Sequence, residues 1–105
     1  MPWIYLFIAG IFEIIWAFSM KQSQGFSQLI PSIITLFTMA ISFWLLAIAM
    51  KSIPLSTAYM IWTGIGAVGA FLVGVLVLAE PINTLRITAA SLIVSGLVLM
   101  KLSSP

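Results

Sequence analysis

Glu13 is the residue whose type and position most clearly predict chemistry in this sequence. It lies in the apolar segment 9–21, AGIFEIIWAFSMK, where the nearest basic residue is Lys21 at the far end. In a helix, Gly10 and Trp16 share its face, because residues three apart are neighbours. Gly10 makes room for a ligand or a neighbouring backbone, and Trp16 can offer its N–H to a carboxylate or its π-face to a cation. The pattern predicts a functional site around a buried carboxylate.

The depth of Glu13 strengthens this interpretation. It lies about ten residues into its segment, and at about 1.5 Å per residue this corresponds to roughly 15 Å, near the centre of a bilayer. An acid at that depth costs at least ~2.5 kcal/mol on insertion scales and by default indicates a functional site. The alternative is that Glu13 stays protonated, or hydrogen-bonded to a neighbouring helix, and only holds helices together.

The segments that must position Glu13 have the composition of membrane helices. Of the 105 residues, 63% are hydrophobic and 6% are charged, whereas a soluble domain has roughly a quarter charged residues. Four apolar stretches, at about 3–21, 29–50, 55–79 and 85–102, are separated by short polar breaks. Each is close to the ~20 residues needed to cross a bilayer. We therefore expect an all-α membrane protein with four transmembrane helices in one domain, 1–105.

Composition also excludes several function classes. The chain has no Cys and no His, so we expect no metal site and no cofactor. Its four Lys and Arg residues are spread along the chain and make no patch for nucleic acid. A lone buried Glu with scattered hydroxyls makes no pair of nucleophile and base, so we expect no enzyme. The start, MPWIYLF, has no basic region or cleavage signal and is interpreted as a retained membrane helix.

The charges that usually fix membrane orientation are balanced. With four spans, Lys51 and Lys101 fall on one side of the membrane, and Lys21 and Arg86 fall on the other. The positive-inside rule therefore has little to act on, and we expect copies to insert both ways up. Four short helices cannot enclose a cavity and offer two access states, whereas two oppositely inserted copies supply inverted symmetry. We predict an antiparallel, dual-topology homodimer; the alternative is one orientation fixed by weak signals.

The other helices carry chemistry that matches Glu13. Ser42 lies at mid-depth in the second helix, and Tyr59 and Trp62, three residues apart, each bring a donor to the third. Gly64 and Gly66 follow directly and predict a helix bend, which switching between two access states requires. The fourth helix has small residues among Leu, Ile and Val and no ionisable residue between Arg86 and Lys101, so we assign it to dimer packing.

Taken together, these residues resemble the small multidrug resistance transporters. The resemblance is carried by Gly10, Glu13, Trp16, Ser42, Tyr59, Trp62, the glycine pair and Lys101, and by the KQSQGF loop and the AYMIWTGIG run. The EIIWA run is similar to the guanidinium-exporter subtype. The multidrug subtype typically has small residues where this chain has bulky Ile15 and Trp16. The resemblance covers essentially the whole chain.

The resemblance implies an antiporter of a bacterial inner membrane that exports guanidinium, or small substituted guanidines, in exchange for protons. It implies that Glu13 binds proton and substrate in turn, with Gly10, Trp16, Ser42, Tyr59 and Trp62 around it. The partners are then guanidinium, protons, membrane lipid and a second copy of the chain. Two alternatives stay open: a broader antiporter for lipophilic quaternary ammonium cations, and a membrane packing subunit that transports nothing.

Overall fold

The computed structural model describes residues 1–103, and over this range it contains four helices and no strand. The helices are α1 (Pro2–Gln22), α2 (Leu29–Ala49), α3 (Leu55–Leu76) and α4 (Thr84–Ser103). Each is long and apolar enough to cross a membrane. The predicted all-α membrane fold with four transmembrane helices is therefore confirmed.

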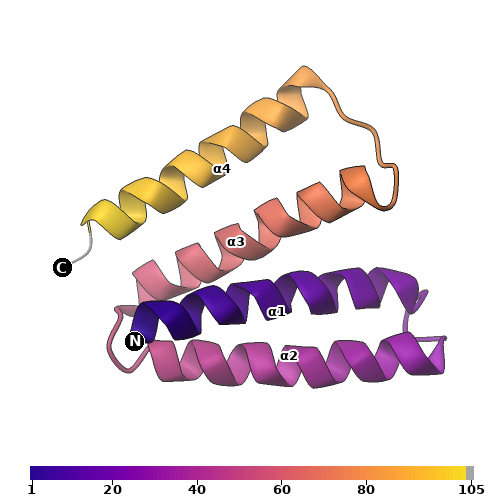
Figure 1. Cartoon of the computed structure of the whole chain (residues 1–105), viewed down its shortest axis with the longest axis horizontal. Coiled ribbons are helices and arrows are strands. Elements are labelled where there is room, and N and C mark those ends of the chain that lie inside the picture. The colour runs from indigo at the N-terminus through magenta and orange to yellow at the C-terminus, as the bar shows by residue number, and fades with distance from the viewer. Residues whose placement is uncertain (104–105) are drawn as a thin grey trace.

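Local sequence explains where α1 stops. Ser23 follows the helix, and its hydroxyl donates to the Met20 carbonyl at 2.6 Å and accepts from the Phe26 N–H at 3.0 Å. The backbone then turns through positive φ angles at Gln24, Gly25 and Phe26, a region that only glycine adopts without cost. This short polar turn reverses the chain and lays α2 antiparallel to α1 (Figure 1).

The third helix ends at Leu76, three residues before the predicted boundary at residue 79. Ala79 has a φ of 55°, and the Glu80 N–H donates back to the Gly74 carbonyl at 2.9 Å. Pro81 follows and disfavours helix at the residue before it. Helix α4 starts at Thr84 because the Asn83 side chain accepts a hydrogen bond from the Arg86 N–H at 2.9 Å, which caps the first turn.

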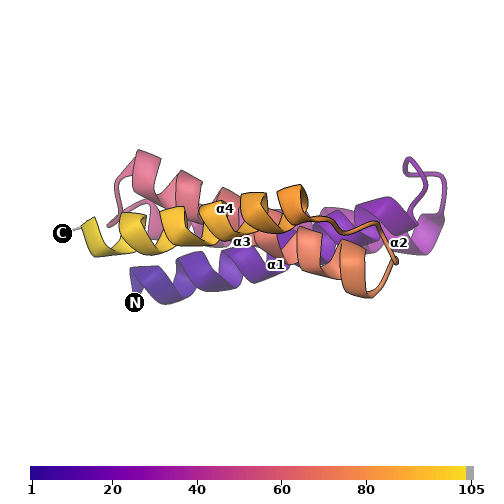
Figure 2. The same cartoon turned by 90° about the horizontal axis from the view of Figure 1, so that it is seen from above.

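The helices form a thin slab in which α1 lies between α2 and α3, and α4 packs mainly on α3 (Figure 1). The overall extents are 43 × 35 × 16 Å, and Figure 2 shows the narrow direction. A helix with its side chains is about 10 Å across, so the slab is between one and two helices thick. A single copy therefore cannot surround a cavity on all sides.

The buried core lies where α1, α2 and α3 meet. Its apolar members are Leu6, Ala9, Leu46, Ala49, Ile53, Ala58, Ile61 and Trp62. Within the described part of the chain, α4 contributes no buried residue. The core thus fixes the first three helices against one another and leaves most of the fourth uncovered.

Candidate functional site

Glu13 projects from the middle of α1 onto the surface of α3 at Gly66. The carboxyl group lies so close to the α3 backbone that a Cβ on Gly66 would overlap it. Glycine at this position brings the α3 backbone up to the carboxylate, which any other residue would exclude. The sequence pattern predicted that Gly66 contributes to a helix bend; the structure gives it a direct contact with Glu13.

Two buried polar atoms on this face of α1 have no hydrogen-bond partner in residues 1–103. They are Glu13 Oε1 and Trp16 Nε1, an acceptor and a donor one turn apart. Buried polar atoms in proteins are almost always paired, so each such exception requires an explanation. An acid and an indole therefore lie on one face, as predicted. The carboxyl oxygen can accept a hydrogen bond from a further partner, and the indole N–H can donate one.

Ser42 joins all three helices of the core. Its hydroxyl donates to the Ala9 carbonyl of α1 at 2.7 Å and accepts from Trp62 Nε1 of α3 at 3.0 Å. Its side chain is fully buried, and Trp62 is 6% exposed. Other hydroxyls of α2 behave differently: Thr35 and Thr38 bond carbonyls of their own helix. In an α-helix the Ala9 carbonyl also accepts the Glu13 amide, so Ser42 holds the backbone one turn from the acid.

Replacing Ser42 by Ala should lower the free energy of unfolding by about 1 kcal/mol, because the buried Trp62 N–H loses its acceptor. The control is Thr38→Val, which removes a hydroxyl that bonds only within α2 and should change stability much less. Denaturation in detergent micelles, followed by Trp fluorescence, measures both. Equal effects of the two substitutions would contradict a special role for Ser42.

Four aromatic rings form a continuous row beside this network. Trp16 contacts Phe43 at 6.2 Å between ring centroids, and Phe43 and Tyr59 each contact Trp62 at 5.6 Å. Trp62 is buried, whereas Tyr59 is 52% exposed. Sequence reasoning missed Phe43, which carries no polar group; its position directly after Ser42 is the signal that could have found it.

Two other predicted site residues, Gly10 and Gly64, lie at close contacts between helices. A Cβ on Gly10 would lie 2.6 Å from Ile65 of α3, so the space at Gly10 is filled by Ile65 of the same chain. A Cβ on Gly64 would overlap the Leu97 side chain of α4. Helix α3 is continuous through Gly64 and Gly66, and the bend there stays a prediction.

Lys101 lies apart from Glu13. Its ammonium group is 4.3 Å from the centroid of the Trp3 ring, at the start of α1, and this cation–π contact joins the ends of α1 and α4. Across residues 1–103 the ion pair present is Arg86 with Glu80, at 4.0 Å, so Glu13 has no basic side chain beside it.

Comparison with known proteins agrees with this arrangement. Residues 1–93 match the model of the family described as Small Multidrug Resistance protein. The chain belongs to the small multidrug resistance family. Members of the small multidrug resistance family are transporters rather than enzymes, and this chain is a multi-pass protein of the inner membrane.

Individual relatives within the small multidrug resistance family are similar over their full length. A protein of Yersinia pseudotuberculosis named guanidinium exporter is 54% identical over 104 residues, which is 99% of this chain and 100% of the relative. Proteins with the same name from Escherichia coli K12 and Salmonella typhimurium are 51% and 52% identical over 104 residues, covering 99% of both chains in each case. These relatives span the whole site described above.

Proposed function

We propose that this protein exports guanidinium ion across the membrane in exchange for protons. The observation that carries the proposal is the half-buried Glu13 in the middle of a membrane helix, whose Oε1 atom is buried and which has no hydrogen-bond or ion-pair partner in residues 1–103. The full-length similarity to proteins named guanidinium exporter supports the choice of substrate. Glu13 is then the binding site that proton and substrate share.

Exchange follows from competition for one charge. A carboxylate in hydrocarbon is stable only when a proton or a cation neutralises it. If the ionised pocket cannot reorient across the membrane, only loaded states change sides, and a proton moving inward drives a cation outward. A membrane potential acts on any uncompensated charge with about 2.3 kcal/mol per 100 mV.

The groups around Glu13 support a planar cation with N–H donors. Guanidinium can meet a carboxylate with two parallel N–H groups, as an arginine side chain does. Its flat face suits the row of Trp16, Phe43, Trp62 and Tyr59. A quaternary ammonium ion has no N–H, and each buried acceptor left unpaired costs about 1–3 kcal/mol. Small substituted guanidines that keep two N–H groups fit the same site.

We also propose that the working unit is an antiparallel homodimer. One copy is 16 Å thick in its narrow direction, too thin to enclose Glu13 on all sides. Helix α4 has no buried residue within residues 1–103 and offers Ser91, Ser95 and Gly96 as small residues for close packing. The basic residues are divided two against two between the membrane faces, which favours insertion both ways up. The dimer brings a second Glu13, and the pair titrates as one coupled unit.

The test is guanidinium exchange in liposomes that contain the purified protein and a trapped pH dye. We expect a guanidinium gradient to move protons in the opposite direction. Apparent guanidinium affinity should fall by up to about tenfold per pH unit on the acid side, because protons then occupy Glu13, and should level off at higher pH. Tetramethylammonium at the same concentration is the comparison without N–H donors.

Each outcome decides between the candidates. Exchange with guanidinium but not with tetramethylammonium supports the proposal. Equal exchange with both ions favours a broad multidrug antiporter, for which the exposed ring of Tyr59 provides apolar surface. Guanidinium movement that does not depend on pH contradicts proton coupling, and no movement of either ion favours a packing subunit.

A further inference from the structure

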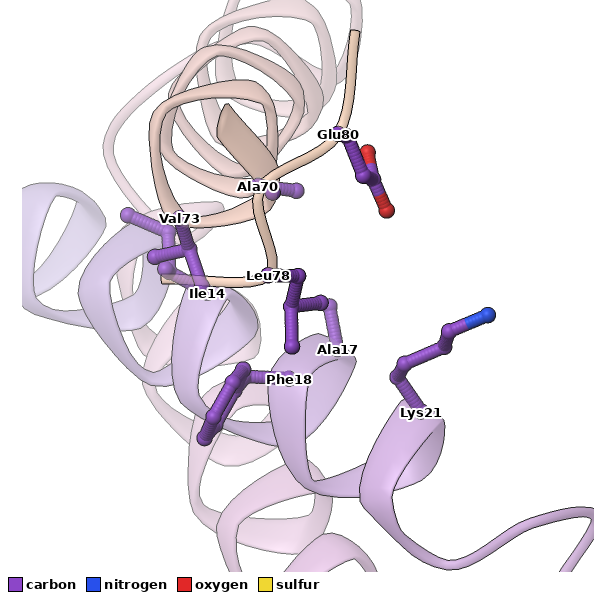
Figure 3. Close-up of a pocket in the computed structure, with 9 residues that line it drawn as sticks. Ile14, Ala17, Phe18, Lys21, Ala70, Val73, Leu78 and Glu80 are labelled. Carbon is purple, nitrogen blue, oxygen red and sulfur yellow. The ribbon is translucent and has the colours of Figure 1, made fainter. Parts of the chain in front are cut away.

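A second feature with recognisable chemistry is a groove between the last turns of α1 and α3, called here the end groove (Figure 3). Its volume is about 200 Å³. It is lined by Ile14, Ala17, Phe18, Lys21, Ala70, Val73, Gly74, Leu78 and Glu80. Seven of these residues are apolar or small, and Lys21 and Glu80 bring one charge of each sign. The proposed transport cycle uses neither charge.

The two charges lie at the mouth of the end groove. In Figure 3 the Lys21 and Glu80 side chains extend on the same side, away from Ile14 and Val73. Lys21 is the second-last residue of α1, and Glu80 follows the end of α3. Both positions are at the ends of membrane spans, where phospholipid headgroups lie. The apolar wall continues from there into the spanning part of α1 and α3.

Contacts of its backbone and side chain fix the position of Glu80. The Ala79 backbone turns with a φ of 55°, and the Glu80 N–H donates to the Gly74 carbonyl at 2.9 Å. The carboxyl group then lies against Gly74 so closely that a Cβ there would overlap it. Arg86 approaches Glu80 at 4.0 Å, the outer limit of an ion pair. The carboxylate therefore keeps acceptor capacity toward the groove.

Lys21 offers the complementary charge. No ion pair joins Lys21 to an acid in the described residues, and its side chain is exposed. A lysine ammonium group has three N–H donors and binds phosphate as a point charge. A ligand that spans the mouth must therefore present an anion to Lys21 and a cation to Glu80, with an apolar tail along the groove.

We propose that the end groove binds a phospholipid whose headgroup carries a primary amine, phosphatidylethanolamine. Its phosphate pairs with Lys21, its ammonium group donates to Glu80, and one acyl chain lies along Ile14, Phe18 and Val73. Choline lipids present the same phosphate and the same positive charge but no N–H. Glycerol headgroups present no cation at all. The site therefore distinguishes the amine from both.

The experiment uses the full-length protein in mild detergent and measures bound lipid by native mass spectrometry. Phosphatidylethanolamine, phosphatidylcholine and phosphatidylglycerol with identical acyl chains are added in turn. We expect roughly tenfold tighter binding of the amine lipid, the effect of one charge-assisted hydrogen bond. Glu80→Gln should reduce the amine lipid to the level of the choline lipid, and Lys21→Gln should weaken both. Lys51→Gln, at the other end of the bundle, is the matched charge control and should change neither.

A further variant separates position from charge. Gly74→Ala keeps both charges but pushes the Glu80 carboxyl group out of its place, so it should reduce the preference for amine over choline while leaving the phosphate contribution of Lys21. Equal binding of amine and choline lipids by the unaltered protein overturns the proposal. So does a preference that survives Glu80→Gln.

Two alternatives to a bound lipid at the end groove predict different results. A direct pair between Lys21 and Glu80 predicts that Glu80→Gln lowers thermal stability in lipid-free detergent and that no lipid is selected. A second copy of the chain predicts that the same substitution changes the oligomeric state rather than lipid binding. Either result overturns the proposal, and neither bears on guanidinium exchange.

Discussion

Replacing Glu13 by Gln should abolish guanidinium-driven proton movement, down to the level of liposomes without protein. Glutamine keeps the size and the hydrogen-bonding oxygen of the side chain but removes the titratable charge. It cannot exchange a proton for a cation, because it binds neither in the pH range of a cell. The measurement is the internal pH of liposomes after addition of guanidinium. Because the effect is chemical, the variant should fold and assemble like the unaltered protein.

Controls for this prediction use stability and a conservative change. Glu13→Gln removes the charge of a half-buried acid whose Oε1 atom is unpaired, so the free energy of unfolding should stay the same or rise. Glu13→Asp keeps a carboxylate at shorter reach and should retain exchange at a lower rate, with its pH dependence still present. Full guanidinium-coupled proton movement in the glutamine variant would remove Glu13 from the mechanism.

Apolar segment lengths in the sequence were enough to predict the four helices. Hydrophobic runs of membrane length leave few alternatives, because backbone groups in lipid must pair within the helix. The end of α3 was harder to predict from the sequence. Ala79 carries no signal for a left-handed turn, and the turn depends on a hydrogen bond from the Glu80 N–H to the Gly74 carbonyl. Periodicity describes the middle of a helix better than its end.

The candidate site was predictable where it depends on one helix. The spacing of Glu13 and Trp16 fixes their common face, and both carry buried unpaired atoms in the described chain. Contacts between helices were not predictable, because they depend on how far α3 and α2 approach α1. The bond from Ser42 to the Ala9 carbonyl, the contact of Phe43 with two indoles and the approach of Gly66 to Glu13 belong to this class.

The contact between Gly66 and Glu13 leads to the second large prediction. Gly66→Ala should weaken apparent guanidinium affinity by about tenfold to a hundredfold, which corresponds to losing one charge-assisted hydrogen bond. The added methyl group would overlap the Glu13 carboxyl and Cγ atoms, so the acid must swing out of its place. Guanidinium binding to the purified variant, followed by Trp fluorescence or calorimetry, measures the loss.

Gly69→Ala is the matched control, because it adds the same methyl group one turn further along the same pair of helices. There the added Cβ would overlap the Cδ1 and Cγ1 atoms of Ile14, so Ile14 must change rotamer or α1 and α3 must move slightly apart. We expect Gly69→Ala to lower the free energy of unfolding by about 1–3 kcal/mol and to leave guanidinium affinity within about twofold, since an apolar side chain and not the acid gives way. If both alanine variants lose affinity equally, the loss reflects spacing of α1 and α3 in general. If Gly66→Ala alone loses affinity, the backbone of α3 positions the carboxylate, and a glycine at residue 66 is a requirement of the binding site.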